Sequence, residues 1–198
     1  MSSNGLLTDL DEQKDMLANV DAEGQPIPTI RFMGGKEYSS ISRNADAEVS
    51  YADIKYVIDN HIFALPSFAD EGGPYRFKRG YIVGPYEYTP GLSIALATMY
   101  CALVTDHCLS LLNSNGPIFV EGRFASSSLF CRLLATYRRS QTVLRSLDRT
   151  GSLIGAIALA KWPSVPKYLT QDEKVDVIND LDQLDQYRNF WRRQLEDL

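Results

Sequence analysis

The residues most able to do chemistry lie in a turn between a short apolar strand and a helix. A strand is expected over residues 117–120, and Gly122 ends it in a turn. Residues 126–137 are expected to form a helix. Backbone N–H groups at a helix start attract an anion, and glycine lets a phosphate or ribose approach the backbone. The pattern predicts a nucleotide-binding turn, but a plain strand-to-helix connection, common to all α/β folds, also fits it.

An excess of arginine follows this turn. Between residues 123 and 149 the sequence has six arginines and one acidic residue, Asp148, which gives a local charge of +5. The arginines are Arg123, Arg132, Arg138, Arg139, Arg145 and Arg149. A polyanion such as a nucleoside triphosphate would suit that charge. A solubilising surface explains the arginines from position 132 onward equally well.

Other kinds of chemistry find no support. Cys101 and Cys108 are seven residues apart on one predicted helix, too far apart to share a zinc ion, and His61 and His107 have no ligand spacing. No nucleophile elbow, P-loop or G-x-G-x-x-G motif is present. We therefore assign no catalytic residue and no metal ligand from the pattern. Three cysteines, an odd number, predict a reducing compartment without disulfides.

The composition is that of a folded, acidic chain. Of 198 residues, 44% are hydrophobic and 23% are charged, with a net charge of −5. These values exclude a disordered chain or a coiled-coil rod, and the missing basic excess argues against a nucleic-acid partner. The longest apolar stretch, residues 92–112, is interrupted by polar residues, so we expect a core helix and no membrane span. Residues 1–15 show no signal peptide, which favours a cytoplasmic location.

The elements that would position the turn alternate between strands and helices. A hairpin is expected at residues 16–33, and Thr89 and Pro90 are the N-cap and first residue of a long helix. Residues 64–90 form a long aromatic loop that either covers the core or meets a partner. The sequence Thr170–Glu173 is a capping box, which predicts that a C-terminal helical region begins there. Further helices are expected at residues 36–41, from residue 50 onward and at residues 152–161. Further strands are expected at residues 81–83 and 142–144.

Three consecutive segments resemble the C-terminal domain of the FGGY carbohydrate kinases, in the actin–hexokinase–sugar kinase superfamily. They are the long helix from residue 91 to 112, the strand, Gly-Arg and helix over 118–135, and the Thr-Gly-x-x-x-Gly-Ala pattern over 150–160. The resemblance covers about residues 15–162. It implies an α/β, ribonuclease-H-like (actin-like ATPase) domain over residues 1–162, incomplete at its N-terminal side. This domain has a mixed sheet with flanking helices and an N-terminal hairpin, and residues 163–198 form a C-terminal helical extension packed on it.

The resemblance also implies a function. The family transfers the γ-phosphoryl group of ATP, with magnesium, to a sugar hydroxyl. By that resemblance, Gly122, Arg123, Phe124 and Ala125 lie near the nucleotide, and Gly155 shapes the adenine side. Arg123 stands where many members have a second glycine, so its side chain either contacts the phosphate or crowds it.

The resemblance further implies that part of the catalytic machinery lies outside this sequence. The family's catalytic aspartate and second phosphate loop precede the point where these residues begin, and its sugar-contacting residues lie in an N-terminal domain. The isolated chain is therefore expected to be inactive, with a missing N-terminal kinase domain or a second copy as partner. The alternative is a non-catalytic interaction module derived from a sugar kinase. The sugar itself is not defined by these residues.

Overall fold

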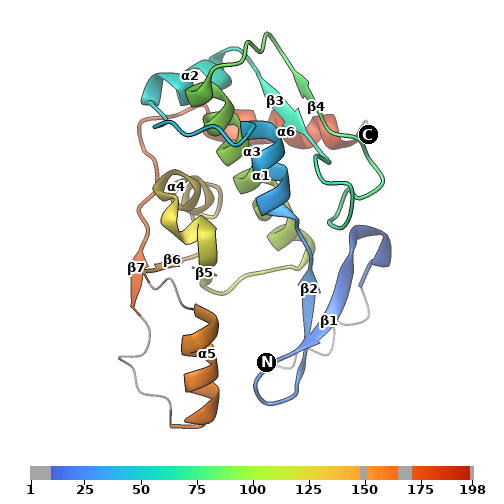
Figure 1. Ribbon diagram of the computed structural model, residues 1–198, viewed down its shortest axis with the longest axis vertical. Coiled ribbons are helices and arrows are strands. Elements are labelled where there is room, and N and C mark those ends of the chain that lie inside the picture. Colours follow the sequence, from blue (N-terminus) through green and yellow to red (C-terminus); the bar gives the residue numbers. More distant parts are fainter. Residues whose placement is uncertain (1–9, 148–150, 165–170, 197–198) are drawn as a thin grey trace. The chain divides into compact units, whose positions relative to one another are not determined.

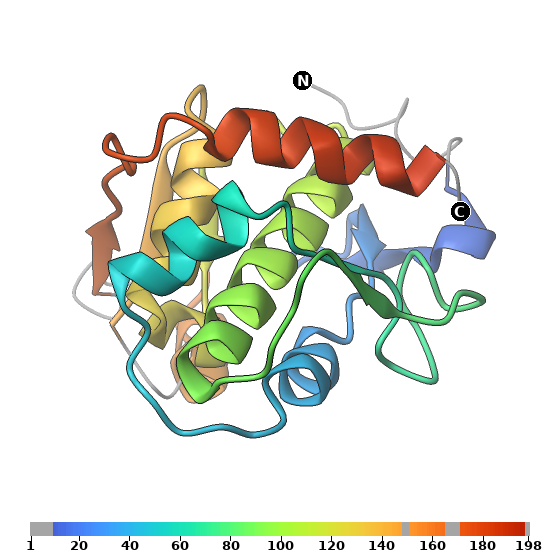
Figure 2. The same cartoon turned by 90° about the horizontal axis from the view of Figure 1, so that it is seen from above.

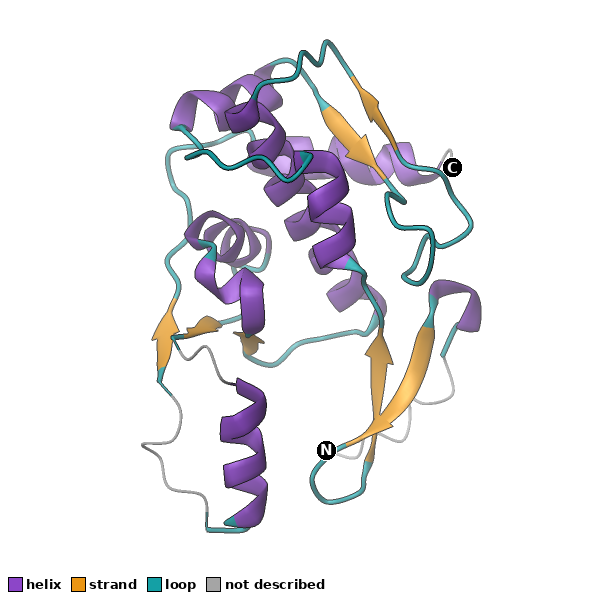
Figure 3. Cartoon of the chain, viewed as in Figure 1, coloured by secondary structure: helices purple, strands orange, loops and turns teal. Residues whose placement is uncertain are grey.

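The chain forms two units that are interleaved along the sequence (Figure 1). Residues 10–147, 151–164 and 171–196 are described in a computed structural model. Unit 1 comprises Met1–Asn113 and Asn179–Leu198, and unit 2 comprises Ser114–Ile178. The predicted division after residue 162 falls inside unit 2. The strands described are short, three to five residues each, and helices provide most of the regular structure (Figure 3).

The long predicted helix is the centre of unit 1. It is α3 (Pro90–Leu111), and the Thr89 side chain accepts a hydrogen bond from the Leu92 N–H at 3.2 Å, so the predicted cap is confirmed. Among the described helices, α3 is the one long and apolar enough to cross a membrane, and 83% of its apolar window is buried in the protein. A helix that is apolar on every side needs cover all round. Its burial makes α3 the core helix that the sequence predicts.

Two shorter helices pack on α3. They are α1 (Gly34–Ser42) and α2 (Tyr51–Asp59). The Ser50 hydroxyl accepts a hydrogen bond from the Asp53 N–H, and the Asp53 carboxylate accepts one from the Ser50 N–H at 2.9 Å. This capping box starts α2 where the sequence predicts it. The predicted hairpin is also present, as β1 (Met16–Val20) and β2 (Pro26–Ile30) in antiparallel register.

The aromatic loop contains a strand pair that the sequence analysis predicted only in part. β4 (Tyr81–Val83) is the expected strand, and it pairs antiparallel with β3 (Phe63–Leu65), which was assigned to the loop from residue 64 onward. A three-residue strand is too short to show alternation, so this part of the prediction was wrong. Within this loop the Phe68 ring packs edge to face on Tyr100 of α3, with ring centroids 5.5 Å apart, whereas Phe77 is 76% exposed.

The last helix, α6 (Leu184–Glu196), closes over the β3 segment of unit 1. The Trp191 indole N–H donates to the Ala64 carbonyl at 2.8 Å, and the Tyr187 hydroxyl donates to the Ile62 carbonyl at 2.6 Å. Figure 2 shows α6 lying across α3. There, the Arg192 guanidinium donates to the buried Asp106 carboxylate at 2.7 Å. Buried backbone carbonyls need a donor, so these side chains attach α6 firmly to unit 1.

The predicted start of the C-terminal helical region was wrong. Thr170 lies outside the described residues, and Asp172–Lys174 form a strand, β7, instead of a first helical turn. β7 pairs antiparallel with β6 (Val143–Ser146), and an ion pair of 2.5 Å joins Arg145 to Glu173. Strand pairing and this ion pair outweigh the local preference of a capping sequence, and α6 begins only at Leu184.

Unit 2 is built on a mixed three-stranded sheet. β5 (Ile118–Val120) pairs parallel with β6, and α4 (Ser128–Tyr137) connects them. Of the four apolar residues that the sequence predicts to face inward, Phe130, Leu133 and Leu134 are buried and Leu129 is partly exposed. The order β5–β6–β7 leaves β5 at an edge, with no strand on its other side among the described residues. Unit 2 therefore ends, among the described residues, at an unpaired strand edge, whose free N–H and C=O groups can pair with a further strand.

Helix α5 (Gly151–Ala160) of unit 2 is exposed. The sequence predicts that its small-residue face packs closely on a sheet, but Gly155, Ala156 and Ala160 are not buried, and Gly155 is fully open. Leu153 and Leu159 are also exposed, by 59% and 57%. Glycine and alanine side chains bury little apolar area, so this face gives α5 little stabilisation for packing on the short strands described here.

Besides Asp106, two further buried carboxylates, Glu37 and Asp15, sit in unit 1. Glu37 accepts hydrogen bonds from the Tyr100 hydroxyl and from the Phe68 N–H, the latter at 3.0 Å. Burial raises the pKa of the Glu37 carboxyl, and these hydrogen bonds oppose that rise. Because the Tyr100 and Phe68 donors come from α3 and the aromatic loop, Glu37 connects three segments of unit 1 at one point.

The second carboxylate, Asp15, fastens the hairpin. The Arg31 guanidinium donates to both Asp15 oxygens, at 2.5 and 2.9 Å, and the buried Gly73 N–H donates to one of them at 2.8 Å. The hydrogen bonds from Arg31 hold the pKa of the Asp15 carboxyl below its ordinary value of 3.8. Asp15 thereby ties the start of β1 to the loop before β4.

Candidate functional site

The predicted turn after β5 exists, and its glycine has an unusual backbone. Gly122 has φ of +70°, a left-handed conformation that side chains rarely adopt. A Cβ placed on Gly122 would meet no atom within 4 Å, so the space above this backbone is open. The turn thus combines a backbone shape that favours glycine with unhindered access for a ligand.

The turn continues into a short 3-10 helix, η4 (Gly122–Ser126), before α4 begins. The sequence predicts a helix start at Ser126, whereas α4 starts at Ser128 with Ser127 as its cap. The Ser127 hydroxyl accepts the Phe130 N–H at 3.2 Å, so one donor at the helix start is already occupied. Gly122 is therefore separated from the N-terminus of α4, and the predicted helix-dipole contribution to anion binding there is smaller than expected.

The remaining turn residues play different roles. Phe124 stacks on Phe130 of α4 with ring centroids 4.4 Å apart, and Ala125 is buried. The Cys131 thiol donates to the Phe124 carbonyl at 3.4 Å. Arg123 is exposed and makes no ion pair with another described residue. Phe124 and Ala125 support the turn, and Arg123 is the side chain available to an anion.

Gly155 is not brought to this turn. It lies in α5, exposed, and no atom comes within 4 Å of the position that a Cβ would take. The described structure therefore joins Gly122, Arg123, Phe124 and Ala125, and leaves Gly155 apart from them.

The arginine excess is partly neutralised. Arg145 pairs with Glu173, and Arg139 donates to the Ile178 carbonyl at 3.4 Å. Arg149 lies outside the described residues, and Arg132 lines a cavity of about 210 Å³. The lining of that cavity is Ser128, Cys131, Arg132, Arg145, Glu173, Lys174, Val175 and Asp176. The carboxylates come from β7 and the residues just after it, far along the sequence, which explains why local charge overstated the basic character of this surface.

No metal site is found within the described ranges, since they hold no group of three or more histidine, cysteine or acidic residues placed to bind one ion. Cys101, Cys108 and Cys131 are free and buried. Burial raises the pKa of the Cys131 thiol to about 11, so the thiol is protonated at neutral pH and is a poor nucleophile.

The mixed sheet, the crossover helix α4 and the glycine turn at a strand end are those of an α/β domain. The family match and the first structural similarity given below assign it to the ribonuclease-H-like class, as predicted. The chain itself is a member of the carbohydrate kinase FGGY family, C-terminal domain, whose sequence model matches residues 1–168. A comparison with curated proteins gave no match.

Many solved structures are similar to this chain, and two of them are kinases with the following similarity. A carbohydrate kinase from Novosphingobium aromaticivorans has a TM-score of 0.79 and 30% sequence identity, covering 95% of this chain and 41% of that one. Xylulose kinase from Rhodospirillum rubrum has a TM-score of 0.61 and 15% identity, covering 93% of this chain and 42% of that one. The 198 residues thus span about two fifths of the length of these kinases.

Proposed function

We propose that this chain is the C-terminal, nucleotide-side portion of a kinase that transfers the γ-phosphoryl group of ATP to a carbohydrate hydroxyl. The observation that carries the proposal is the family match over residues 1–168. The 30% identity to a carbohydrate kinase, over 95% of this chain, supports it. We further propose a cytoplasmic location.

The turn after β5 is the proposed contact with ATP. Gly122 offers open backbone to the ribose or a phosphate, the Arg123 guanidinium is available to pair with a phosphate oxygen, and Phe124 and Ala125 hold the turn in place. Gly155 is proposed to lie on the adenine side. Magnesium, when bound with ATP, neutralises phosphate charge. The described residues offer it no ligand cluster, so the phosphates and the rest of the enzyme would hold it.

Catalysis is proposed to require the portion of the kinase fold that these residues do not span. Phosphoryl transfer depends on positioning and charge neutralisation from both sides of a cleft. That portion would cover two surfaces. One is the open edge of β5, where Phe119 is 57% exposed, and the other is formed by the exposed Leu153, Leu159 and Trp162. A second copy of this chain is the alternative partner that would cover these surfaces.

A complementation assay tests the proposed activity. The purified chain is combined with the N-terminal portion of the Novosphingobium kinase, and ADP release is followed with ATP, magnesium and a panel of ketoses and polyols. We expect no turnover from either part alone and clear turnover from the mixture.

The assay separates three outcomes. Turnover by the chain alone would overturn the proposed division of the site. Complex formation without turnover on any sugar would favour a non-catalytic interaction module. Phe119→Ser serves as a variant that weakens the complex, and Phe77→Ser, also exposed but in unit 1, is its matched control.

Nucleotide binding at Gly122 gives a separate prediction. We expect the isolated chain to bind ATP with a Kd near the millimolar range, about −4 kcal/mol, because one wall of the cleft is present. Gly122→Val should abolish the ATP-induced NMR shifts of residues 122–126, since a β-branched side chain resists φ of +70° and fills the open approach. Arg123→Ala weakens binding if Arg123 contacts a phosphate, and tightens it if Arg123 blocks the site.

Gly24→Val is the matched control for backbone strain. Gly24 has φ of +77° and, like Gly122, no atom within 4 Å of the place that a Cβ would occupy, but it lies in the turn of the unit 1 hairpin. ATP binding should survive Gly24→Val. Equal loss of binding in both variants, or flat shifts at Gly122 in the unchanged chain, would remove the turn from the nucleotide site.

A further inference from the structure

The loop that joins α3 to β5 contains an asparagine followed by a glycine, Asn115 and Gly116. Both residues are exposed, and they lie in irregular backbone between the helix and the strand. The loop belongs to unit 2 from Ser114 onward. It leads into β5, and the Gly122 turn follows the other end of that strand, so the loop and the turn flank the same strand.

An asparagine followed by glycine can undergo a reaction that needs no enzyme. The glycine nitrogen loses its proton and bonds to the side-chain carbonyl carbon, Cγ, of the asparagine, while the Cγ–Nδ2 bond breaks and ammonia leaves. The product is a five-membered cyclic imide. Water then opens the ring, at the side-chain carbonyl to give aspartate or at the main-chain carbonyl to give isoaspartate. The overall change consumes one water and releases one ammonia, so no oxidant or reductant takes part.

Both reacting groups of this loop are accessible. Within the described ranges, the Gly116 N–H donates no hydrogen bond and the Asn115 side chain makes none. A Cβ placed on Gly116 would meet no atom within 4 Å, so no neighbouring group shields the nitrogen. Glycine also rotates more freely than other residues. The nitrogen can therefore approach Cγ without the movement of a packed element.

Other asparagines are hindered by their surroundings. After Asn44, the next N–H, that of Ala45, donates to the Ser42 carbonyl at 3.0 Å. After Asn60, the next N–H donates to a carbonyl of α2 at 3.1 Å, and the Asn60 amide itself donates to α2 at 3.0 Å. In both cases the attacking nitrogen already has an acceptor. Among the described residues, Asn115 is the asparagine that a glycine follows.

Gln141 connects the residues on both sides of position 115. Its side-chain amide donates to the Gly116 carbonyl at 2.6 Å and to the Ser114 hydroxyl at 3.3 Å, and we call this pair of hydrogen bonds the Gln141 clamp. Isoaspartate adds one atom to the main chain between the two acceptors, because the chain then runs through Cβ and Cγ. Hydrogen bonds weaken steeply when distance and angle change, so the lengthened segment no longer fits the clamp.

The start of β5 lies directly after the clamp. The Ile118 N–H donates to the Thr142 carbonyl at 2.9 Å, and Thr142 is the residue after Gln141. The clamp and the first hydrogen bond of β5 therefore join the same two short segments of unit 2. Loss of the clamp should loosen this first hydrogen bond, because local opening depends on neighbouring contacts.

We propose that Asn115 is a site of spontaneous deamidation, which proceeds through a cyclic imide with Gly116 and releases the Gln141 clamp from the start of β5. The modification adds a negative charge and, in its isoaspartyl form, an extra main-chain atom to unit 2. The reaction needs only water and this loop, so it takes place whether or not the Gly122 turn binds ATP.

Peptide mapping of the full chain tests the reaction. The chain is incubated at mildly alkaline pH, digested with trypsin and followed by mass spectrometry, with electron-transfer fragmentation to distinguish isoaspartate from aspartate. We expect a gain of one mass unit at Asn115, faster than at Asn44 or Asn60. The pair Asn4 and Gly5, outside the described residues, falls in a separate peptide. An Asn115 that reacts no faster than Asn44 would overturn the proposal.

A glycine variant tests the mechanism. Gly116→Ala should slow the reaction at Asn115 roughly tenfold or more, because a Cβ restricts the backbone and shields the nitrogen. The open space at this position accommodates that Cβ, so the fold is kept. Gly35→Ala, at an equally open glycine in α1, is the matched control and should leave the rate at Asn115 unchanged. Equal rates in Gly116→Ala and the unchanged chain would exclude the imide route.

Amide hydrogen exchange at Ile118 tests the release of the clamp. We expect exchange roughly tenfold faster in the isoaspartyl form than in fresh protein, because the first hydrogen bond of β5 opens more often. Asn115→Asp carries the new charge on an ordinary main chain and should keep the slow exchange. The same exchange rate in the isoaspartyl form and in fresh protein would show that the clamp is not released.

Discussion

Replacing Trp191 by alanine is expected to lower the free energy of unfolding by about 3–5 kcal/mol, the range for truncating a large buried aromatic side chain. Trp191 is fully buried, and its indole N–H satisfies the Ala64 carbonyl of β3. The alanine variant leaves a cavity and an unsatisfied buried carbonyl at the same place. Urea unfolding followed by far-UV circular dichroism measures the loss.

Two variants control this result. Trp191→Phe keeps most of the apolar volume and loses the N–H donor, so we expect a loss of about 1–3 kcal/mol from the unpaired Ala64 carbonyl. Phe190→Ala changes the adjacent, partly exposed residue and should cost less than about 1 kcal/mol. If Trp191→Ala is no more costly than Phe190→Ala, α6 does not stabilise unit 1 through β3.

The second large effect concerns Asp15. Asp15→Asn should lower the free energy of unfolding at neutral pH by about 1–2 kcal/mol, at the low end for a charged hydrogen bond because solvent screens the exposed Arg31. The pKa of Asp15 is lowered in the folded state, so its stabilisation is present above its ordinary value of 3.8 and is lost as pH falls through the folded value. The difference between the two proteins should shrink below about pH 4.

Asp70→Asn provides the comparison for Asp15, because Asp70 is exposed and lies in the loop whose Gly73 N–H donates to Asp15. It should change stability by less than about 0.5 kcal/mol at any pH. A difference between Asp15→Asn and the unchanged protein that stays constant from neutral to acid pH would show that Asp15 acts through its shape and not its charge.

Local signals in the sequence predicted the long elements well. α3 follows from the Thr89 cap, Pro90 and a continuous apolar stretch, and α2 follows from the Ser50–Asp53 capping box. Strands of three residues carry no periodicity. β4 and β5 were predicted from the glycine and proline residues that flank them, and β3 and β7 were missed. The capping sequence at 170–173 predicted a helix start, but Asp172 and Glu173 belong to β7, which pairs with β6. This pairing involves residues distant in the sequence, so the local pattern does not indicate it.

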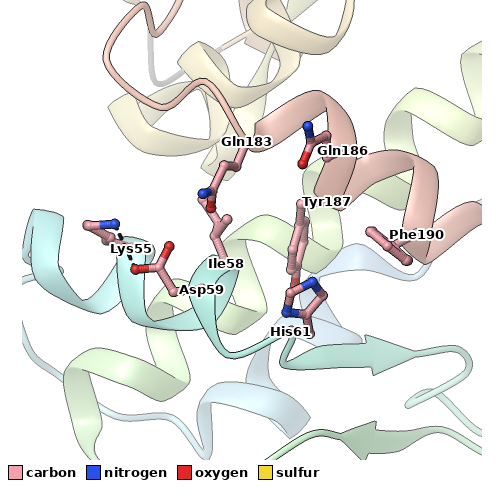
Figure 4. Close-up of a pocket in the computed structure, with 8 residues that line it drawn as sticks. All are labelled: Lys55, Ile58, Asp59, His61, Gln183, Gln186, Tyr187 and Phe190. Atoms are coloured by element: carbon pink, nitrogen blue, oxygen red, sulfur yellow. Dashed lines mark hydrogen bonds and ion pairs between the residues drawn. The ribbon is translucent and has the colours of Figure 1, made fainter.

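The turn at Gly122 was predicted because one short segment defines it, whereas features that form where distant segments meet were missed. The left-handed backbone at Gly122 agrees with a glycine read as a turn, and Arg123 is exposed. The neutralisation of Arg145 by Glu173, 28 residues later, does not follow from local charge. A cavity of about 410 Å³ between α2 and α6 joins residues 55–61 with residues 183–190 (Figure 4), and no spacing rule connects such distant residues.

The interleaved order of the two units has a consequence for how the protein is made. The carbonyls of Ile62 and Ala64 are synthesised 125 and 127 residues before Tyr187 and Trp191, the side chains that satisfy them. A chain emerging from the ribosome therefore holds all of unit 2 while unit 1 still lacks α6. Until α6 has emerged, β3 and the side of α3 that it covers remain open, so the nascent chain passes through a stage in which its largest core is accessible to chaperones and prone to aggregation.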